Sequence, residues 1–355
     1  MSYYETIGSQ GFYIIAEIGV NYYEIAENNN ISPLNAAKLM IKKAAEAGAD
    51  AVKFQTYKAE NLAMVDSPGS WSREDIPIET QYELFQLYDK FGEAEYRELS
   101  EYSKECGVDF FSTPFDLDSV EYLNPLMDMY KISSSDISNI PLIISIAKKN
   151  KPIIMSTGAA DYNEIEFAVD LIRQYNDKQL TLLHCVLEYP TPYEHANLQK
   201  IQSLKTEFPD MIIGYSDHTK PDEGMLTLTT AYLLGAQVIE KHFTLDKTIK
   251  LKNDHFHSMD DKDLKVFHSN LERITQLMGK GDLVCLSSEV PTKDSVRRSA
   301  VAIRDLRQGE VLGWEHIIFK RPGVGLAPKE CMELIGKKLT KNVNKDQVIS
   351  RDDFE

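Results

Sequence analysis

The stretch Ile212-Ile-Gly-Tyr-Ser-Asp-His218-Thr and its continuation Val238-Ile-Glu240-Lys-His242-Phe-Thr decide the fold of this chain. Each is a short apolar run of β type that ends abruptly in polar side chains, and a helical segment, 224–234, separates them. This order predicts a strand, a helix and a parallel strand. Because the carboxyl ends of neighbouring parallel strands lie side by side, we expect His218 and His242 to meet, and we interpret them as ligands of one divalent metal ion.

The same alternation runs through the first 280 or so residues. Apolar runs alternate with amphipathic helical segments in the number that a closed (β/α)8 TIM barrel of about 250 residues requires. The predicted strands are Tyr13–Ala16, Ala51–Phe54, Asp109–Phe111, Met129–Ile132, Pro152–Met155, Leu182–Cys185, Met211–Tyr215 and Val238–Glu240. The predicted helices are Pro33–Ala47, Glu93–Cys106, Ile140–Lys149, Glu164–Tyr175, Leu198–Phe208 and 224–234.

The composition narrows the class of partner. The chain has 39 Lys and Arg against 55 Asp and Glu, a net charge of −16, which argues against nucleic acid or an anionic membrane as partner. The N-terminal residues lack the basic and apolar regions of a signal peptide, and no apolar run has membrane-spanning length, so we expect a cytoplasmic protein. Four widely spaced cysteines predict reduced thiols rather than a disulfide framework.

Every predicted strand ends in polar residues, at the rim where a TIM barrel carries its active site. They include Glu17, Lys53, Thr113, Lys131, Ser134, Ser156, Ser216 and Glu240. Any one of them could be a turn or a helix cap, but polarity at eight strand ends favours a site. Two lysines in one barrel mouth require an anion, and the hydroxyls are donors for phosphate or carboxylate oxygens.

The metal ligands and the lysines together indicate a type of reaction. Imidazole and carboxylate ligands favour Mn²⁺, Zn²⁺, Fe²⁺ or Co²⁺ over Ca²⁺, and an open site of this kind polarises a carbonyl group. Next to a pocket for a small phosphorylated anion, such a site favours a carbon–carbon bond-forming lyase or synthase over a simple hydrolase.

Two long segments, 57–78 and 245–258, are expected to lie over the same rim. The first is longer than an ordinary connection in a barrel and is predicted to act as a lid. The second contains His255 and His257, an HxH pair. Metal binding by this pair is the less favoured interpretation, because a loop histidine is more often a surface or substrate-contact residue.

The composition changes after residue 281. Residues 282–294 are predicted to be a linker, and 295–355 a small, mainly β domain with two similar strand–turn–strand segments, Arg304–Leu312 and Lys341–Ile349. The barrel domain is accordingly expected to span 1–281. Arg321 lies in a basic turn of the small domain, and on this pattern alone it is expected to be a solvent-exposed residue.

The motifs at these positions resemble the sialic acid synthase family over essentially the whole chain. They are Ile15-Ala-Glu17-Ile-Gly, Ala51-Val-Lys53-Phe-Gln-Thr, Ser112-Thr113-Pro-Phe, Tyr130-Lys131-Ile with Ser134, Met155-Ser156-Thr-Gly, Leu183-His184-Cys with Tyr189-Pro-Thr-Pro-Tyr, Gly214-Tyr-Ser216-Asp-His218-Thr, Glu240-Lys-His242-Phe-Thr and Lys320-Arg321-Pro-Gly. The C-terminal part is similar to the antifreeze-like (SAF, β-clip) domain of that family.

The resemblance implies a transferase that condenses phosphoenolpyruvate (PEP) with an N-acylated mannosamine-type aldose and water. The sugar would be N-acetylmannosamine or a 2,4-diacetamido-trideoxy hexose, and the products a sialic-acid-type nonulosonic acid and phosphate. The aldehyde would be activated by a metal and the C–O bond of PEP broken. His218 and His242 would hold Mn²⁺, with Mg²⁺ or Co²⁺ as alternatives.

The resemblance also implies a role for each rim residue. PEP would be bound by Lys53, Thr113, Lys131, Ser134, Ser156 and Ser216, and the sugar by Glu17, Tyr189, Asp254 and Arg321. The catalytic residues would be Asp136, as an acid, with Glu17, Lys53, Lys131 and Glu240. Arg321 would reach the N-acyl group of a partner subunit's substrate in a domain-swapped homodimer, which replaces the expectation of a solvent-exposed residue.

Four departures from the family pattern leave the exact sugar open. Asn21-Tyr22-Tyr23-Glu24 stands where Asn-His-Asn-Gly is usual, Asp136 where Glu is common, Leu187 where some members have Asn, and Ser295 where an aromatic residue can occur. The product could be legionaminic or another nonulosonic acid. Two further alternatives are another PEP-condensing barrel that acts on a sugar phosphate, and a non-catalytic carbohydrate- or ice-binding protein.

Overall fold

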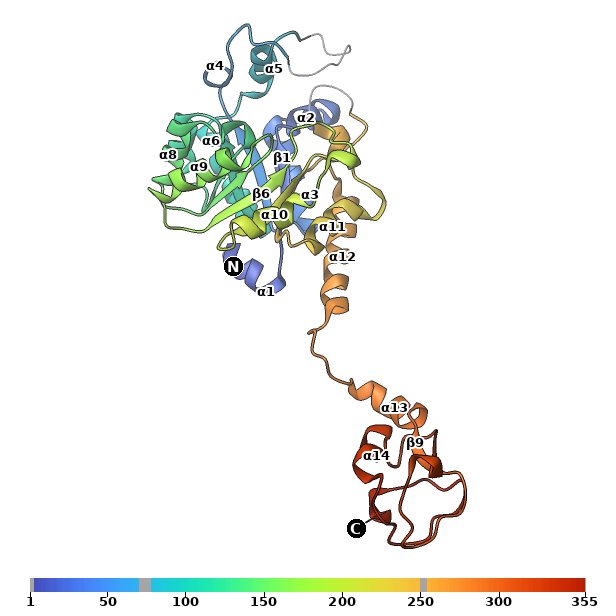
Figure 1. Cartoon of the computed structure of the whole chain (residues 1–355). Helices are drawn as coiled ribbons and strands as arrows, with labels where there is room; N and C mark the ends of the chain where they lie inside the picture. Colours follow the sequence, from blue (N-terminus) through green and yellow to red (C-terminus); the bar gives the residue numbers. More distant parts are fainter. Residues whose placement is uncertain (1–2, 70–77, 250–253, 355) are drawn as a thin grey trace. The chain divides into compact units, whose positions relative to one another are not determined.

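The structure, a computed structural model, describes residues 3–69, 78–249 and 254–354 (Figure 1). The chain forms two compact units, Met1–Leu277 and Met278–Glu355. The strands of the first unit are β1 Tyr13–Gly19, β2 Ala51–Thr56, β3 Asp109–Pro114, β4 Tyr130–Ile132, β5 Ile153–Ser156, β6 Leu180–Cys185, β7 Ile212–Asp217 and β8 Val238–His242. They pair in parallel in the order β3-β2-β1-β8-β7-β6-β5-β4, and the end strands β3 and β4 lie against each other, so the predicted TIM barrel is confirmed.

Most strands extend further than their apolar runs. β1 and β3 each continue three residues past the predicted carboxyl end, and β8 continues two. Glu17, Thr113 and His242 are therefore strand residues rather than loop residues. Their backbone positions are set by the hydrogen bonds of the sheet, which makes the base of the rim rigid.

Helices surround the sheet and form connections above it. They are α1 Tyr3–Gln10, α2 Tyr22–Asn29, α3 Pro33–Glu46, α4 Ala59–Leu62, α5 Gln81–Tyr88, α6 Glu93–Cys106, α7 Leu117–Leu123, α8 Ile140–Ala147, α9 Tyr162–Arg173, α10 Lys200–Glu207, α11 Leu226–Leu233 and α12 Asp261–Met278. Short 3₁₀ helices are η1 Ser134–Asp136, η2 Tyr193–His195, η3 Glu223–Met225 and η4 Asp254–His257. The predicted helices are confirmed as α3, α6, α8, α9, α10 and α11, whereas α1, α2, α4, α5, α7 and α12 were not predicted. Within the described ranges, no helix has the length and apolar content needed to cross a membrane.

Local sequence signals explain where several helices begin and end. Ser32 caps α3 by accepting a hydrogen bond from the backbone N–H of Asn35, and Pro33 occupies the first turn. Thr80 and Glu83 form a reciprocal capping box at the start of α5, beside the predicted lid segment. Residues 70–77 of the lid segment and 250–253 of the second predicted loop lie outside the described residues.

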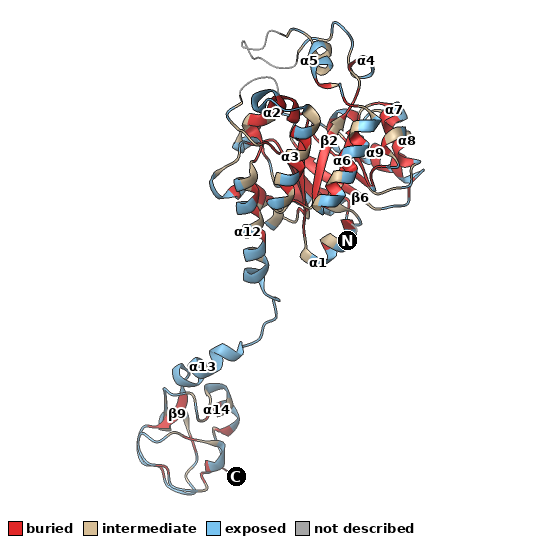
Figure 2. Ribbon diagram, turned by 180° about the vertical axis from the view of Figure 1, so that it is seen from behind, coloured by how far each residue is buried: buried red, intermediate tan, exposed pale blue. Residues whose placement is uncertain are grey.

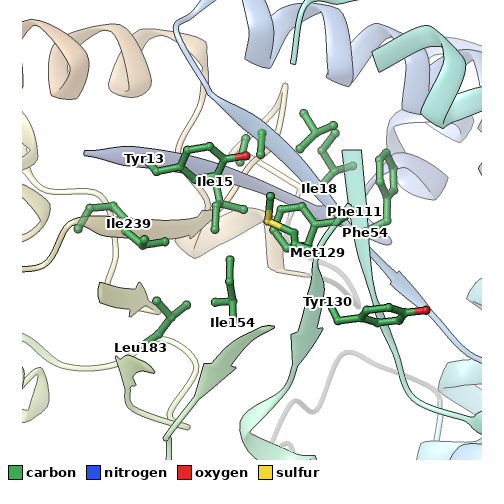
Figure 3. Close-up of a cluster of buried hydrophobic side chains, with 14 of the residues drawn as sticks. Tyr13, Ile15, Ile18, Phe54, Phe111, Met129, Tyr130, Ile154, Leu183 and Ile239 are labelled. Carbon is green, nitrogen blue, oxygen red and sulfur yellow. The ribbon is translucent and has the colours of Figure 1, made fainter. Parts of the chain in front are cut away.

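The core of the barrel is an apolar interior below the polar rim. The strands of the barrel are coloured mainly as buried in Figure 2. Ile15, Ile154, Leu183 and Ile239, from four different strands, belong to this core (Figure 3). Burying a side chain of this size contributes about 1.5–3 kcal/mol each. Helix α1 lies at the end of the barrel opposite α4 and α5 (Figure 1), where the Tyr3 hydroxyl lies 2.8 Å from Thr181 Oγ1 at the start of β6. The rim near α4 and α5 is thus left as the open end.

The second unit is small and built on a separate core. Its regular elements are η5 Ser287–Glu289, α13 Val290–Val296, β9 Ser299–Ala302, η6 Trp314–His316, β10 Ile317–Lys320, α14 Pro328–Leu334 and η7 Arg351–Asp353. The two similar segments identified in the sequence pair with each other, since Leu306 and Val343 form an antiparallel bridge. The segment predicted as a linker, 282–294, contains η5 and the start of α13.

Candidate active site

A cavity of about 810 Å³ opens at the carboxyl end of the barrel. The predicted site residues that line it are Glu17, Lys53, Thr113, Lys131, Ser134, Ser156, Tyr189, Ser216, His218, Glu240, His242 and Asp254. They come from strands and loops spread over more than 200 residues of sequence. The barrel brings all of them to one cavity, as the strand order requires.

Two lysines and two glutamates form the floor of the cavity. Lys53 Nζ lies 2.7 Å from Glu17 Oε2 and 3.7 Å from Glu240 Oε1, and Lys131 Nζ lies 3.6 Å from the same Glu240 oxygen. All four side chains are buried. The register of the sheet sets this arrangement, because Glu17 on β1 lies opposite Lys53 on β2. Their four formal charges cancel, and each lysine can exchange a glutamate for a substrate anion.

The pKa values of the floor residues follow from burial and from these pairs. Burial alone would lower the pKa of Lys53, but Glu17 and Glu240 outweigh it and raise the pKa. Burial lowers the pKa of Lys131, and Glu240 offsets this only in part. Burial raises the pKa of Glu17 despite the opposing effect of Lys53. Burial would also raise the pKa of Glu240, but the two lysines and a hydrogen bond from Ser216 lower it.

Hydroxyl groups surround the two ammonium groups. Lys53 Nζ donates a hydrogen bond of 3.2 Å to Thr113 Oγ1, and Lys131 Nζ donates one of 2.7 Å to Ser156 Oγ. Ser134 Oγ lies at the start of η1 and accepts a hydrogen bond from the backbone of the β5 turn. A hydroxyl can turn its hydrogen toward a bound oxygen, so the ring can donate to phosphate or carboxylate.

Two predicted metal ligands stand at the ends of neighbouring strands. The rings of His218 and His242 lie 5.5 Å apart between centroids, and both are buried. His218 Nδ1 donates to the backbone carbonyl of Val186 at 2.7 Å, which leaves Nε2 for another partner. His242 Nδ1 is buried and has no hydrogen-bond partner among the described residues. The two rings are thus neighbours at the rim, and their binding of one divalent ion stays a prediction.

The turn η4 brings Asp254 and His257 to the same place. Asp254 Oδ2 lies 3.6 Å from His242 Nδ1, and Asp254 Oδ1 lies 3.7 Å from His257 Nε2. Potential ligand atoms of His242, Asp254 and His257 all lie within 4.8 Å of one another. Burial and the nearby rings of His257 and His218 lower the pKa of His242 well below its ordinary value, so this imidazole is neutral and can bind a metal.

The two histidines of the HxH pair have different surroundings. His255 Nε2 lies 2.9 Å from Glu24 Oε2, and its Nδ1 lies 2.6 Å from Thr244 Oγ1. His255 therefore anchors the turn to α2 and to Thr244, two residues beyond the end of β8. His257 instead faces His242, with 5.0 Å between the ring centroids. Nothing in the HxH pattern distinguishes these two histidines.

A buried ion pair lies next to His218 and His242. It joins Asp217 of β7 to Lys241 of β8. Lys241 Nζ donates to Asp217 Oδ2 and to the backbone carbonyl of Thr219. The sheet register places Asp217 directly opposite Lys241. Each member of the pair is adjacent in sequence to a histidine, so the pair fixes the spacing of β7 and β8 at the point where His218 and His242 emerge.

Helix α5 and its neighbours supply an apolar wall that the sequence did not predict. Leu84, Phe85 and Tyr88 of α5 line the cavity with Tyr57 and Phe115. The capping box at Thr80 and Glu83 was a detectable signal for this helix.

The unusual residues after β1 explain how α5 is held. Tyr22 stacks on Phe91 with 4.7 Å between centroids, Tyr23 packs at 5.4 Å from Tyr88, and the Tyr88 hydroxyl donates to Glu24. The departure Tyr22-Tyr23-Glu24 from the family pattern is therefore an interface between α2 and the wall of the cavity.

Two predicted site residues are not among the residues that line the cavity. Asp136 is buried in η1, where its carboxylate accepts hydrogen bonds from Ser133 Oγ and Asn139 Nδ2, and it does not line the cavity. Arg321 belongs to the second compact unit. Of the other departures, Leu187 lines the cavity and Ser295 lies in α13 of the second unit.

The fold and cavity define the class of protein: a TIM barrel with a rim site of lysines, carboxylates and imidazoles, followed by a small β domain. Residues 40–283 match the NeuB family, and residues 297–355 match the SAF domain. The chain belongs to the NeuB family, which confirms the resemblance seen in its motifs.

Known relatives cover nearly the whole chain. It is 39% identical to the N,N'-diacetyllegionaminic acid synthase of Campylobacter jejuni, over 95% of this chain and 98% of that protein. It is 37% identical to the N,N'-diacetyllegionaminic acid synthase of Legionella pneumophila, over 94% and 91%. The crystal structure of N-acetylneuraminic acid synthetase from Leptospira borgpetersenii, in complex with citrate, is 34% identical with a TM-score of 0.66, covering 79% of this chain and 90% of that one.

Proposed function

We propose that this chain is a nonulosonic acid synthase that condenses PEP with an unphosphorylated N-acylated mannosamine-type aldose and water, releasing phosphate. The observation that carries the proposal is the position of Lys53 and Lys131 on the floor of the cavity that His218 and His242 also line. An anion site thus adjoins a candidate metal site. The names of the relatives as synthases of nonulosonic acids support it, and the two legionaminic acid synthases favour a 2,4-diacetamido-trideoxy sugar.

PEP binding requires Lys53 to change its partner. One anionic group of PEP would replace Glu17 beside Lys53, and the other would bind Lys131, which keeps its contact with Glu240. The hydroxyls of Thr113, Ser134, Ser156 and Ser216 would act as further donors. The exchange keeps both ammonium groups paired, so little extra charge is left unpaired in the buried floor. The citrate complex of the Leptospira relative shows that a small polycarboxylate binds that protein.

Glu17 is placed to hold a proton during the reaction. Burial raises its pKa, and its main opposing partner is Lys53 at 2.7 Å. When PEP takes over Lys53, Glu17 loses that partner and its pKa rises further, so the carboxyl group takes up a proton. The attack of PEP C3 on the aldehyde carbon creates an alkoxide, and Glu17 would give it this proton.

Glu240 serves the next step. After the new carbon–carbon bond forms, positive charge develops at C2 of the PEP unit, and an ionised carboxylate nearby stabilises it. The lysines keep the pKa of Glu240 low, so it stays ionised. Water would then add to C2 and give one proton to Glu17, which has just lost its own to the alkoxide. The bond between C2 and the bridging oxygen would then break, so that phosphate leaves with that oxygen and with the hydroxyl proton, and C2 becomes a ketone. A divalent ion, Mn²⁺ by preference with Mg²⁺ or Co²⁺ as alternatives, held by His218 and His242 would supply polarisation of the aldehyde carbonyl.

The cavity wall favours a sugar with methyl groups and no phosphate. Among the described lining residues, the ammonium and guanidinium groups are those of Lys53 and Lys131, both on the floor. The wall made by Leu84, Phe85 and Tyr88 suits N-acyl and 6-deoxy methyl groups. Tyr189 and Asp254 would bind sugar hydroxyls.

Two further proposals rest on the family resemblance, and a third, for Asp136, rests on its hydrogen bonds in η1 and replaces the role as an acid. Arg321 from a second copy of the chain would contact the N-acyl group in a domain-swapped homodimer, and the protein would act in the cytoplasm. Asp136 would serve the reaction through η1: its hydrogen bonds to Ser133 and Asn139 hold the turn that carries Ser134.

The test is phosphate release from PEP with alternative sugars, with and without Mn²⁺. We expect release with 2,4-diacetamido-2,4,6-trideoxymannose, less with N-acetylmannosamine, and none with N-acetylmannosamine 6-phosphate or arabinose 5-phosphate. Release with a sugar phosphate alone would assign the chain to a different PEP-condensing activity. Absence of release with every sugar would favour a binding protein.

A further inference from the structure

A third histidine stands behind the two rim histidines. The ring centroid of His257 lies 5.0 Å from that of His242 and 6.0 Å from that of His218, and the side chain is fully buried. His218, His242 and Asp254 line the cavity, whereas His257 does not. The cluster therefore has one imidazole on its protein side and three potential ligands on its cavity side.

Two separations within this cluster, both measured from Asp254, are close to those of atoms that share an ion. Two ligands at about 2.1 Å from one metal lie roughly 3.0–3.5 Å apart, because tetrahedral and octahedral angles separate them. The carboxylate oxygens of Asp254 lie 3.6 Å from His242 Nδ1 and 3.7 Å from His257 Nε2. Both distances exceed a normal hydrogen bond and are close to the spacing around a common ion.

The backbone holds His257 in this position. The end of β8 continues as a bridge between Phe243 and Met259, two residues beyond His257, with Met259 N donating to His242 O at 2.8 Å. Asn21 Oδ1 accepts from Asp254 N, and His255 bonds Glu24. The turn is thus fastened on both sides of His257, which favours a ligand whose position is set before an ion arrives.

We propose that His257, together with Asp254, binds the same divalent ion as His242 and His218, so that the site has three imidazoles and a carboxylate. This inference deepens the proposed function, on which it rests for the presence of a metal. A third imidazole shifts the preference of a site from Mg²⁺ toward Co²⁺ and Zn²⁺, because these ions bind nitrogen ligands more strongly. The chain is then expected to distinguish these ions more sharply than a two-histidine site.

The test is metal binding to the full-length protein after treatment with a chelator. Co²⁺ and Mg²⁺ are titrated into the wild type, H257Q and H195Q, with calorimetry and, for Co²⁺, visible absorption as readouts. His195 is a matched control because it is an exposed histidine that pairs with Glu188. We expect H257Q to lower Co²⁺ affinity at least about tenfold and to change its spectrum, Mg²⁺ affinity to change less than about threefold, and H195Q to match the wild type.

The outcomes separate this inference from the proposed function. Wild-type Co²⁺ affinity and spectrum in H257Q would overturn the role of His257, even if the enzyme condenses PEP with the sugar. Loss of Co²⁺ binding in H257Q, with no phosphate release by the wild type, would keep the ligand assignment and overturn the proposed reaction. Should H257Q fail to fold, the Co²⁺ affinity and spectrum of H257N are compared with those of the wild type. The Co²⁺ spectrum of D254N then tests whether the turn that carries both residues binds the ion.

Discussion

The floor of the cavity and its wall are held in place in different ways. Glu17, Lys53, Lys131 and Glu240 are strand residues whose positions follow from the sheet register. The wall depends on the short helices α2, α5 and η4, which contact one another through side chains. Under the proposed function, the floor would bind PEP, and the wall would distinguish one sugar or ion from another.

The largest expected effect comes from breaking the floor. Lys53→Met should lower PEP affinity at least about 100-fold, because it removes a buried cation and leaves Glu17 and Glu240 without it. Calorimetry with PEP measures the affinity, and thermal unfolding measures the accompanying destabilisation of about 3–5 kcal/mol.

Two controls separate binding from folding. Adding Glu17→Gln to Lys53→Met should recover stability without recovering PEP affinity. Lys38→Met, which removes an exposed pair with Glu98, should change stability by less than about 1 kcal/mol. Wild-type PEP affinity in Lys53→Met would contradict the anion site.

The next effect concerns the divalent ion proposed at His218 and His242. Chelation should abolish phosphate release, and Mn²⁺ should restore it. His218→Ala should need at least about tenfold more Mn²⁺ for half-maximal recovery, because a buried imidazole ligand is lost. Metal content measured after dialysis checks the result independently of turnover. Full metal content and full activity in His218→Ala would rule out this ligand.

A third prediction uses the lowered pKa of Lys131. Anion binding needs the ammonium form, so PEP affinity should fall as pH rises through this lowered pKa, by up to about tenfold per pH unit. Under the proposed function, Glu17 takes up a proton when PEP binds, so this proton uptake also lowers PEP affinity as the pH rises. Lys131→Arg stays charged at all these pH values, so its affinity profile should be flatter at alkaline pH. An equally steep profile in Lys131→Arg would assign the pH dependence to other groups.

The smallest effect tests the wall. Phe85→Ala should raise the KM of the acylated sugar about tenfold and leave the KM of PEP within about twofold, because it removes apolar contact with the sugar alone. Leu87→Ala is the control, since Leu87 lies on the same helix but is exposed and does not line the cavity. Equal changes in both KM values would show that floor and wall are not independent.

The same division explains what could be predicted from the sequence. Parallel strands bring their carboxyl ends together, so the strand-end residues Lys53, Lys131, His218 and His242 could be assigned to one site before any coordinates. The alternation of apolar runs of strand type with amphipathic segments of helical type was enough to predict the barrel.

The wall could not be predicted because its contacts are not periodic. His255 and His257 are two residues apart in one 3₁₀ turn, and which of them faces the site depends on Glu24, 231 positions away in sequence. Asp136 shows the same limit. Consecutive residues of η1 point in different directions, so Ser134 and Ser135 line the cavity and Asp136 does not.

The buried pair between Lys241 and Asp217 has a consequence for the size of ion that the rim accepts. Because this pair joins β7 and β8 beside the imidazoles, the gap between the rings is set by the scaffold rather than by the metal. A larger cation such as Ca²⁺ would have to move β7 and β8 apart against the ion pair between Lys241 and Asp217. Selection by ionic radius would then come from residues that never touch the ion.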